Sequence, residues 1–240
     1  MNAQTIQRRL SACGIPCGPE LAEKLRLYMA LLLDWNRRMD LTAVTDEAEM
    51  LDRHLADSLS ALATPGLIPE TGSLIDVGTG AGFPGMALAL ALPGARVTLL
   101  DSLRKRIDFL AAVKEATGAD NVSLVHARAE DGARQDAHRE RYDLATARAL
   151  APLPALCEYL LPYVRPGGMA LCWKGPALAE ELTAGRRAAH LLGGRAEEPI
   201  PVTIPGQDWQ HSLLPIRKIS RTPAAYPRRA GQPTQKPLGQ

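Results

Sequence analysis

One aspartate and four glycines are concentrated in the segment 76–85, which reads Asp-Val-Gly-Thr-Gly-Ala-Gly-Phe-Pro-Gly. Glycine lets the backbone turn sharply and approach a ligand closely, and such loops follow the first strand of parallel sheets that bind nucleotides. A second acidic residue, Asp101, stands 23 positions after Gly78. At that spacing a carboxylate can accept hydrogen bonds from both hydroxyls of a ribose. The two features together predict a ligand that contains a ribose.

The glycine spacing and the charge of this loop favour one ribose-containing ligand over another. Dinucleotide-binding loops follow the pattern Gly-x-Gly-x-x-Gly, whereas single residues separate Gly78, Gly80 and Gly82. Asp76 precedes Gly78 by two positions, and its carboxylate would attract a cation and repel a pyrophosphate. S-adenosylmethionine carries an ammonium and a sulfonium and no phosphate, so we expect it rather than a nicotinamide dinucleotide. A structural role remains an alternative for each acid: Asp76 as an acceptor for loop amides, and Asp101 as a helix cap.

Short apolar runs alternate with segments of helical spacing from residue 73 onward. This alternation predicts right-handed crossovers and an α/β fold with a mainly parallel sheet. The expected strands are Ser73–Val77, Arg96–Leu100, Val122–His126, Tyr142–Ala147 and Met169–Trp173, separated by helices at Pro84–Leu92, Leu103–Ala116, Pro152–Tyr163 and Ala177–Leu192. Two later runs, Ala196–Ile204 and Ser212–Ile219, would complete seven strands as an antiparallel pair.

The residues before this alternation form a different region. They lack strand-like runs, and apolar side chains recur at helical spacing: Leu21, Leu25, Tyr28, Leu32 and Trp35, then Leu51, Leu55, Leu59 and Leu62. We therefore expect a helical region at 1–70, a ligand-binding domain at 71–220, and a separate tail at 221–240. At its spacing, Trp35 is expected in the core rather than as a platform for a base.

Functional side chains are expected where the later strands end, because ligands bind beyond the carboxyl ends of parallel strands. Arg148 follows the fourth apolar run and Lys174 follows the fifth. We expect both cations above the methyl donor, as catalytic or substrate-contacting groups rather than members of surface ion pairs. Ala129 and Glu130 follow the third run and are expected beside the adenine.

Features that the sequence lacks narrow the choice of acceptor atom for the methyl group. The fourth run ends in Thr-Ala-Arg-Ala-Leu, which lacks the Asp/Asn-Pro-Pro-aromatic turn that usually accompanies methylation of exocyclic amines. Cys157 and Cys172 lie inside an expected helix and an expected strand, so neither is an obvious nucleophile for carbon methylation. A ring nitrogen with a free lone pair, such as guanine N7, needs neither that turn nor a nucleophilic cysteine. We expect catalysis mainly by alignment and electrostatics, without a covalent intermediate.

The composition is that of an ordinary globular protein, with 46% apolar and 22% charged residues. No apolar stretch is long enough to span a bilayer, and the first residues lack the apolar segment of a secretory signal. We therefore expect a cytoplasmic monomer without membrane contact. Four cysteines are read as reduced thiols, and no metal site is expected because no ligand constellation surrounds them.

The net charge of +2 is distributed unevenly along the chain. Residues 217–240 hold six basic and no acidic side chains, which leaves −4 for residues 1–216. A basic tail of this kind is a common electrostatic contact for phosphate backbones. Four prolines after residue 221 disfavour regular structure, so the tail is expected to be flexible.

Beyond single motifs, the chain resembles the bacterial small-subunit rRNA guanine-N7 methyltransferases, the family first named glucose-inhibited division protein B, or ribosomal small-subunit methyltransferase G. The resemblance covers about residues 30–238. Its motifs are the loop at 76–85 with its trailing Pro-Gly, the run 100–106 (Leu-Asp-Ser-Leu-Arg-Lys-Arg), the runs 128–130, 148–149 and 174–175, the upstream positions Trp35, Asn36, Leu41, Thr42, His54 and Asp57–Leu59, and the tail 226–233.

The resemblance implies a Rossmann-like class I methyltransferase fold with helices added in front. It implies cofactor contacts at Gly78, Phe83, Ala129, Glu130 and Arg148, to which the arguments above add Asp76, Gly80 and Asp101. The implied substrate is a guanine in the 530 loop of 16S rRNA, presented in the small ribosomal subunit, and the implied donor is S-adenosylmethionine. Two other function classes stay open: an RNA-binding assembly factor without catalysis, and a nicotinamide-dependent oxidoreductase.

Overall fold

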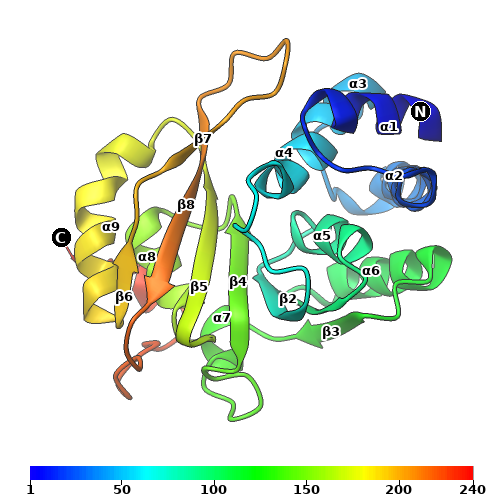
Figure 1. Ribbon diagram of the computed structural model, residues 1–240. Coiled ribbons are helices and arrows are strands. Elements are labelled where there is room, and N and C mark those ends of the chain that lie inside the picture. The colour runs from blue at the N-terminus through cyan, green and yellow to red at the C-terminus, as the bar shows by residue number, and fades with distance from the viewer. Residues whose placement is uncertain (240) are drawn as a thin grey trace.

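The computed structural model describes residues 1–239, which form an α/β protein around one central sheet (Figure 1). The strand order is β3-β2-β1-β4-β5-β8-β6, and β7 also pairs with β8. Strands β1 to β5 are mutually parallel, whereas β8 runs antiparallel to β5. The strands are β1 (Gly72–Val77), β2 (Ala95–Asp101), β3 (Val122–His126), β4 (Tyr142–Arg148), β5 (Val164–Lys174), β6 (Gly194–Ala196), β7 (Ile200–Val202) and β8 (His211–Lys218).

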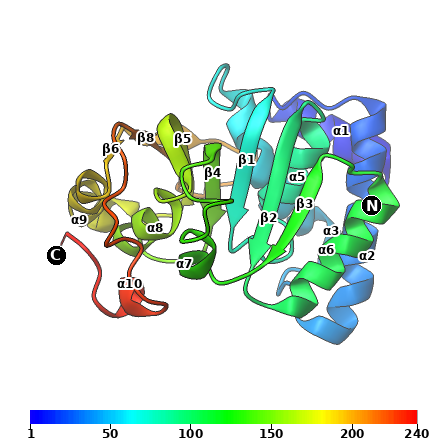
Figure 2. The ribbon, with the colours of Figure 1, turned by 90° about the horizontal axis from the view of Figure 1, so that it is seen from below.

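Helices cover both faces of this sheet, as the largely apolar runs of its central strands require. Figure 2 shows one set of helices on each side of the strands. The first set is α5 (Gly85–Ala91) and α6 (Arg104–Thr117), and the second is α8 (Leu153–Leu160) and α9 (Leu178–Leu191). The strand order reverses between β1 and β4. In open α/β sheets that reversal opens a crevice beyond the strand ends, where ligands bind.

The alternation expected from sequence is confirmed, with one correction at the far edge of the sheet. The run expected as a single strand at 196–204 is divided into β6 and β7, which pair with different parts of β8. Pro199 lies between them and has no amide hydrogen to donate to a ladder. The sheet thus has eight strands, two of which share the seventh position. A further short helix, α7 (Ala129–Gly132), follows β3 where only a strand end was expected.

The N-terminal helices pack against the α5–α6 side of the sheet (Figure 1). Helices α1 (Ala3–Ala12) and α2 (Pro19–Met39) contact each other, and α2 also contacts α5 and α6. The apolar spacing in α2 places Tyr28 fully inside the core. Trp35 lies 5.6 Å from Phe109, measured between ring centroids, which supports the interpretation of Trp35 as a packing residue.

The second apolar repeat is not one continuous helix. It comprises α3 (Glu47–Met50), the π-helical turn η1 (Leu51–Ala56), α4 (Asp57–Leu59) and the 3₁₀ turn η2 (Ser60–Ala63). In η1 the amide of Asp57 donates to the carbonyl of Asp52, five residues earlier. Leu51, Leu55 and Leu59 are still buried, so the apolar repeat is satisfied. Single π turns are frequent at functional sites because they redirect neighbouring side chains.

The tail does not extend into solvent, which corrects the expectation of a flexible segment for the part of 221–240 that the structure describes; Gln240 lies outside it. The guanidinium of Arg228 binds the fully buried carboxylate of Glu158 at 2.6 Å. Arg139, from the loop before β4, donates to the carbonyls of Thr222 and Tyr226. A short helix, α10 (Gln232–Gln235), lies against α8 (Figure 2). The tail is therefore part of the folded body.

Candidate active site

The loop between β1 and α5 adopts a backbone conformation that requires glycine. The φ angles of Gly78, Gly80 and Gly82 are +68°, +61° and +98°, in the left-handed region that side chains disfavour. The amide of Gly78 donates to the carbonyl of Leu100 on the neighbouring strand at 2.8 Å. A Cβ atom at Gly78 would lie 2.5 Å from Leu150 Cδ1. The loop is thus drawn across the ends of β1 and β2, and a side chain at Gly78 would meet the residues after β4.

Asp76 lies beneath this loop rather than in the ligand crevice. Its side chain is fully buried and accepts hydrogen bonds from the Gly85 amide at 3.0 Å and the Thr146 hydroxyl at 2.8 Å. Burial raises the pKa of Asp76 to about 6, despite those hydrogen bonds. The prediction of a direct cofactor contact at Asp76 is therefore corrected: the structural alternative describes this residue, which holds the loop from below.

Asp101 is the last residue of β2, at the predicted position, and its carboxylate binds several protein groups. It accepts from the amides of Gly80 and Leu103, each at 2.9 Å, and lies 3.3 Å from Arg106. The first bond ties the glycine loop to β2, and the second begins the turn into α6. Asp101 does not cap α6, whose N-cap is Leu103 without a side-chain cap; its carboxylate holds the turn before that helix. Its role toward a ribose remains a prediction.

Phe83 closes the glycine loop and forms an aromatic stack with the N-terminal helices. Its ring lies 4.7 Å from the imidazole of His54 and 5.1 Å from Tyr28, between centroids. Burial and the charge of Arg148 lower the pKa of His54 to about 4, so the imidazole is neutral at pH 7. Its Nε2 atom lies 2.8 Å from the hydroxyl of Thr42. These contacts join the upstream motif residues to the loop.

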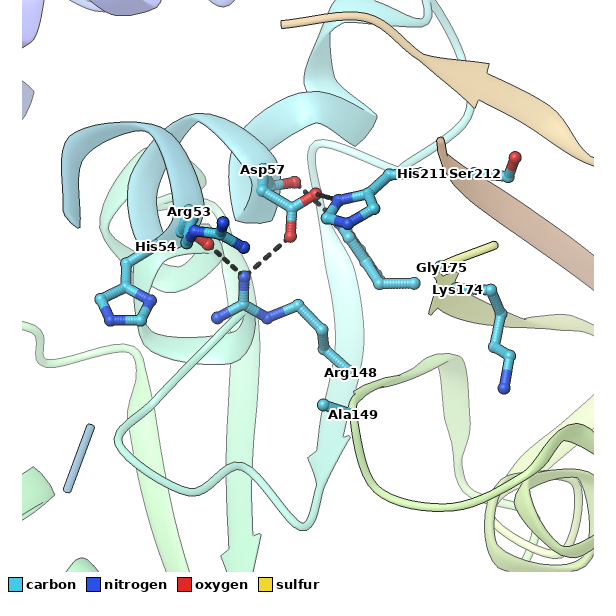
Figure 3. Close-up of a pocket in the computed structure, with 10 residues that line it drawn as sticks. Arg53, His54, Asp57, Arg148, Ala149, Lys174, Gly175, His211 and Ser212 are labelled. Atoms are coloured by element: carbon cyan, nitrogen blue, oxygen red, sulfur yellow. Dashed lines mark hydrogen bonds and ion pairs between the residues drawn. The ribbon is translucent and has the colours of Figure 1, made fainter. Parts of the chain in front are cut away.

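A cavity of about 310 Å³ opens at the ends of β4 and β5, under η1 and beside the start of β8 (Figure 3). Arg148, the last residue of β4, points from the sheet toward η1. Its guanidinium binds the Asp57 carboxylate at 2.8 Å and the Arg53 carbonyl, and lies 5.4 Å from the centre of the Phe83 ring. His211 Nδ1 donates to the other oxygen of Asp57 at 3.0 Å. One carboxylate thus joins residues from three separate parts of the chain.

Lys174 lines the same cavity, but its ammonium is directed away from Arg148 (Figure 3). It forms an ion pair of 2.6 Å with Glu181 on α9, and the Lys174 side chain is only 10% exposed. Lys174 therefore forms an ion pair, which was the alternative interpretation of this residue from sequence. The structure brings Arg148 and Lys174 to neighbouring strand ends, as predicted, but only Arg148 turns toward the glycine loop.

Ala129 and Glu130 begin α7 at the end of β3, on the predicted edge of the sheet. The backbone carbonyl of Ala129 accepts a hydrogen bond from the Tyr163 hydroxyl at 2.6 Å. Glu130 is buried, and its carboxylate accepts the amide of Gly231, from the tail, at 2.8 Å. The tail therefore forms part of the wall around the residues expected beside the adenine.

Neither buried cysteine is placed to act as a nucleophile. Cys157 lies on α8 and Cys172 on β5, and both are fully buried. Burial raises the pKa of Cys157 well above its ordinary value and that of Cys172 to about 12. A thiol is nucleophilic as the thiolate, so both side chains are inert at neutral pH. Within residues 1–239, acidic, cysteine and histidine side chains form no group of three or more suited to a metal ion, and no helix is long and apolar enough to cross a membrane.

Comparison with known proteins identifies the family. The family described as rRNA small subunit methyltransferase G matches residues 21–204. This chain belongs to that family. A relative of that name from Alkaliphilus metalliredigens is 47% identical over 216 residues, which cover 90% of each chain. Another, from Symbiobacterium thermophilum, is 46% identical over 238 residues, which cover 97% of this chain and 96% of the relative.

Solved structures support the class I methyltransferase fold at low sequence identity. A putative methyltransferase in complex with the Trm112 activator from Haloferax volcanii has a TM-score of 0.56 and 17% identity, covering 78% of this chain and 97% of that one. The 16S rRNA (adenine(1408)-N(1))-methyltransferase from Catenulisporales acidiphilia has a TM-score of 0.52 and 17% identity, covering 63% and 87%. The Rossmann-like methyltransferase fold expected from sequence is confirmed.

The residues present fit the cofactor of a methyltransferase, S-adenosylmethionine. A Cβ at Gly78 would lie 2.5 Å from Leu150 Cδ1, so only glycine fits where the loop passes the segment after β4. A buried polar atom beside the loop, His54 Nδ1, has no hydrogen-bond partner within the described residues. Buried polar atoms are normally paired, and a ligand would supply partners here. Arg148 lies 5.4 Å from the centre of the Phe83 ring. Contact of Gly78, Phe83 and Arg148 with the cofactor stays a prediction of the family resemblance.

Sequence reasoning missed His211 and Arg53 and gave Asp57 no role in the site. His211 is 154 positions from Asp57, and no local motif marks either residue as a partner of the other. The only sequence signal was the resemblance of residues 54–59 to the family's helical N-terminus. The pairing depends on how the N-terminal helices dock over the sheet.

Proposed function

We propose that this protein transfers a methyl group from S-adenosylmethionine to N7 of a guanine in the 530 loop of 16S rRNA, within the small ribosomal subunit. The observation that carries the proposal is family membership over nearly the whole chain, together with a glycine loop whose Phe83 lies beside Arg148. The relatives are named for ribosomal RNA of the small subunit. The choice of guanine N7 is supported by the family resemblance and by the absence of the sequence features that accompany methylation of exocyclic amines and carbon atoms.

In this mechanism the protein aligns two substrates and shapes the charge around them. S-adenosylmethionine supplies an electrophilic methyl group, and N7 of guanine already carries the lone pair that attacks it. No residue therefore needs to remove a proton from the acceptor atom. The loop at Gly78 and Phe83 would hold the donor, and the cavity beyond Arg148 would receive the base. Alignment of this kind is sufficient for large rate enhancements.

The transfer would proceed without a covalent enzyme intermediate. Both thiols near the sheet are buried and protonated, which supports direct transfer. We expect Cys157→Ala to keep its rate of methyl transfer. A Cys157→Ala protein that folds normally and is inactive would refute direct transfer. Arg148→Ala is expected to lose transfer because its guanidinium connects the loop, through Phe83, to the N-terminal helices.

The proposal includes a monomeric, cytoplasmic enzyme. To act on RNA, the protein must receive the guanine outside its stack, because an enclosed site cannot admit a base that remains stacked on its neighbours.

The decisive test is transfer of labelled methyl groups to purified small subunits that lack the modification, with naked rRNA and protein acceptors in parallel. After digestion to nucleosides, we expect the label in 7-methylguanosine. Label in another nucleoside would overturn the N7 assignment and keep the methyltransferase. No label in any acceptor, with S-adenosylhomocysteine still bound, would instead favour an assembly factor without catalysis.

A further inference from the structure

The cavity beside Arg148 has one anionic group in its wall, the carboxylate of Asp57. Asp57 is buried and is the first residue of α4, directly after η1. Its oxygens face two different partners, Arg148 at 2.8 Å and His211 at 3.0 Å (Figure 3). Its backbone carbonyl accepts the indole N–H of Trp173 at 2.8 Å. Both the side chain and the main chain of Asp57 are therefore fixed at the mouth of the cavity.

These contacts also fix the charge of Asp57. Burial by itself would raise the pKa of this carboxyl, but His211 and Arg148 lower it below the ordinary value. A buried carboxylate that stays ionised requires compensating partners, and Arg148 of β4 and His211 of β8 supply them here. The fold thus holds an ionised carboxylate in the wall of the cavity, beside the cationic side chains of Arg53, Arg148 and Lys174 that share this lining.

Methyl transfer to a neutral ring nitrogen moves a positive charge. The N7 lone pair forms a bond to the methyl carbon, and the carbon–sulfur bond breaks with its electron pair returning to sulfur. The sulfonium becomes a neutral thioether, and the purine becomes a cation. No proton is transferred and no oxidant is needed. A fixed anion beside the acceptor therefore stabilises the transition state more than the ground state, which is the condition for catalysis.

We propose that the cavity lined by Arg53, Asp57, Arg148 and His211 is the acceptor-base subsite, and that the Asp57 carboxylate stabilises the positive charge that develops on the purine. This proposal rests on the proposed N7 methyl transfer. His211 is a positioning residue, because it acts by holding Asp57. Arg53 adds to the wall of the subsite: its guanidinium stacks on the ring of Trp209 at 4.6 Å from the centroid.

The test replaces the carboxylate with its uncharged isostere, Asp57→Asn. We expect the rate of transfer at saturating substrates to fall about 100-fold, the size of effect seen when one preorganised electrostatic group is removed. The affinities for S-adenosylhomocysteine and for small subunits should be unchanged. The matched control is Asp52→Asn, which also removes a buried carboxylate near η1, but one that binds Arg9 and Gln207 and does not line the cavity. Asp52→Asn should lose stability and keep its transfer rate.

His211 supplies a second variant pair. His211→Ala removes the donor to Asp57, whereas His211→Asn places an amide N–H near the position of Nδ1. We expect the alanine variant to lose transfer rate and the asparagine variant to recover most of it, with the KM for subunits unchanged in both. Equal rates in the two variants would show that His211 does not act through this hydrogen bond.

A binding measurement on the unmodified protein keeps the proposal testable if Asp57→Asn does not fold. With S-adenosylhomocysteine bound, we expect the protein to bind 7-methylguanosine 5′-monophosphate, whose ring is cationic at pH 6, more tightly than guanosine 5′-monophosphate. No preference for the cation would overturn the role of Asp57, as would a folded Asp57→Asn protein with an unchanged rate. Absence of 7-methylguanosine from the wild-type reaction would overturn the proposed function itself, so the two failures are distinguishable.

Discussion

Replacing Arg228 with methionine tests whether the basic tail is a structural part of the fold. Arg228 makes a bidentate ion pair with Glu158, with Nη2–Oε2 at 2.6 Å and Nε–Oε1 at 3.0 Å, and its amide donates to Oε1 at 2.6 Å. Glu158 is fully buried, so the variant leaves a buried carboxylate with only the amide as a partner. Removing one partner of a buried pair costs about 3–5 kcal/mol. At about 2–4 °C per kcal/mol for a chain of this length, we expect Tm to fall by roughly 10 °C.

The neighbouring residue supplies the control. Arg229→Met removes the same charge from an exposed side chain, so its Tm should stay close to that of the wild type. Thermal unfolding followed by circular dichroism measures both variants. The double variant Arg228→Met with Glu158→Gln should recover part of the lost stability, because the neutral amide needs less compensation. Equal Tm values for Arg228→Met and Arg229→Met would refute the anchoring role of the ion pair.

The Arg228→Met substitution should also affect the residues expected beside the adenine of the cofactor. Gly231, three residues after Arg228, donates its amide to Glu130 at the end of β3. We therefore expect Arg228→Met to weaken S-adenosylhomocysteine binding in calorimetry, whereas Arg229→Met should leave it unchanged. Unchanged affinity in Arg228→Met would show that the tail stabilises the body without shaping the adenine side of the site.

Three further outcomes are expected. Replacing the exposed tail cations Arg221, Arg229 and Lys236 with glutamine should reduce the slope of log K for RNA against log salt by about 2, with cofactor affinity kept. Filter binding measures this slope, and a constant slope would show that these side chains bind no phosphates. Gly78→Ala should weaken S-adenosylhomocysteine binding about tenfold or more in calorimetry, whereas Gly118→Ala, also left-handed at +60° but in open space, should not. Lys218 is buried, which lowers its pKa from 10.5 to about 8. Between these pH values the unfolded chain holds more protons than the folded one, so the free energy of unfolding should rise with pH. Denaturant titrations of Lys218→Met should lack that rise, and an unchanged rise would show that Lys218 is not its source.

The sequence by itself determined the elements of the fold and the edge of the sheet that carries the site. Apolar runs of strand length, separated by helical spacing, specify a parallel sheet because both its faces must be covered. Positive φ angles at Gly78 and Gly80 follow from residue type, since only glycine adopts them without strain. Asp101 and Arg148 could be placed at strand ends for the same local reason. The family motifs added the identity of the cofactor.

Tertiary structure decided which protein groups each of these polar side chains binds. Asp76 and Lys174 look equivalent to Asp101 and Arg148 in sequence, yet Asp76 binds Gly85 from below and Lys174 pairs with α9. Half of the tail's six basic residues are likewise unavailable: Arg217 pairs with Glu197, Lys218 is buried against Leu161, and Arg228 binds Glu158. Such pairings depend on which distant segments dock together.

The joining of Asp57, Arg148 and His211 shows the physical reason most clearly. Each belongs to a different element, and nothing in its local sequence requires the other two. They meet because the N-terminal helices bury their apolar face over α5 and α6, which carries η1 across the end of β4 and the start of β8. Local patterns specify secondary structure through backbone and burial preferences, but the docking of whole elements decides which charges meet at a site.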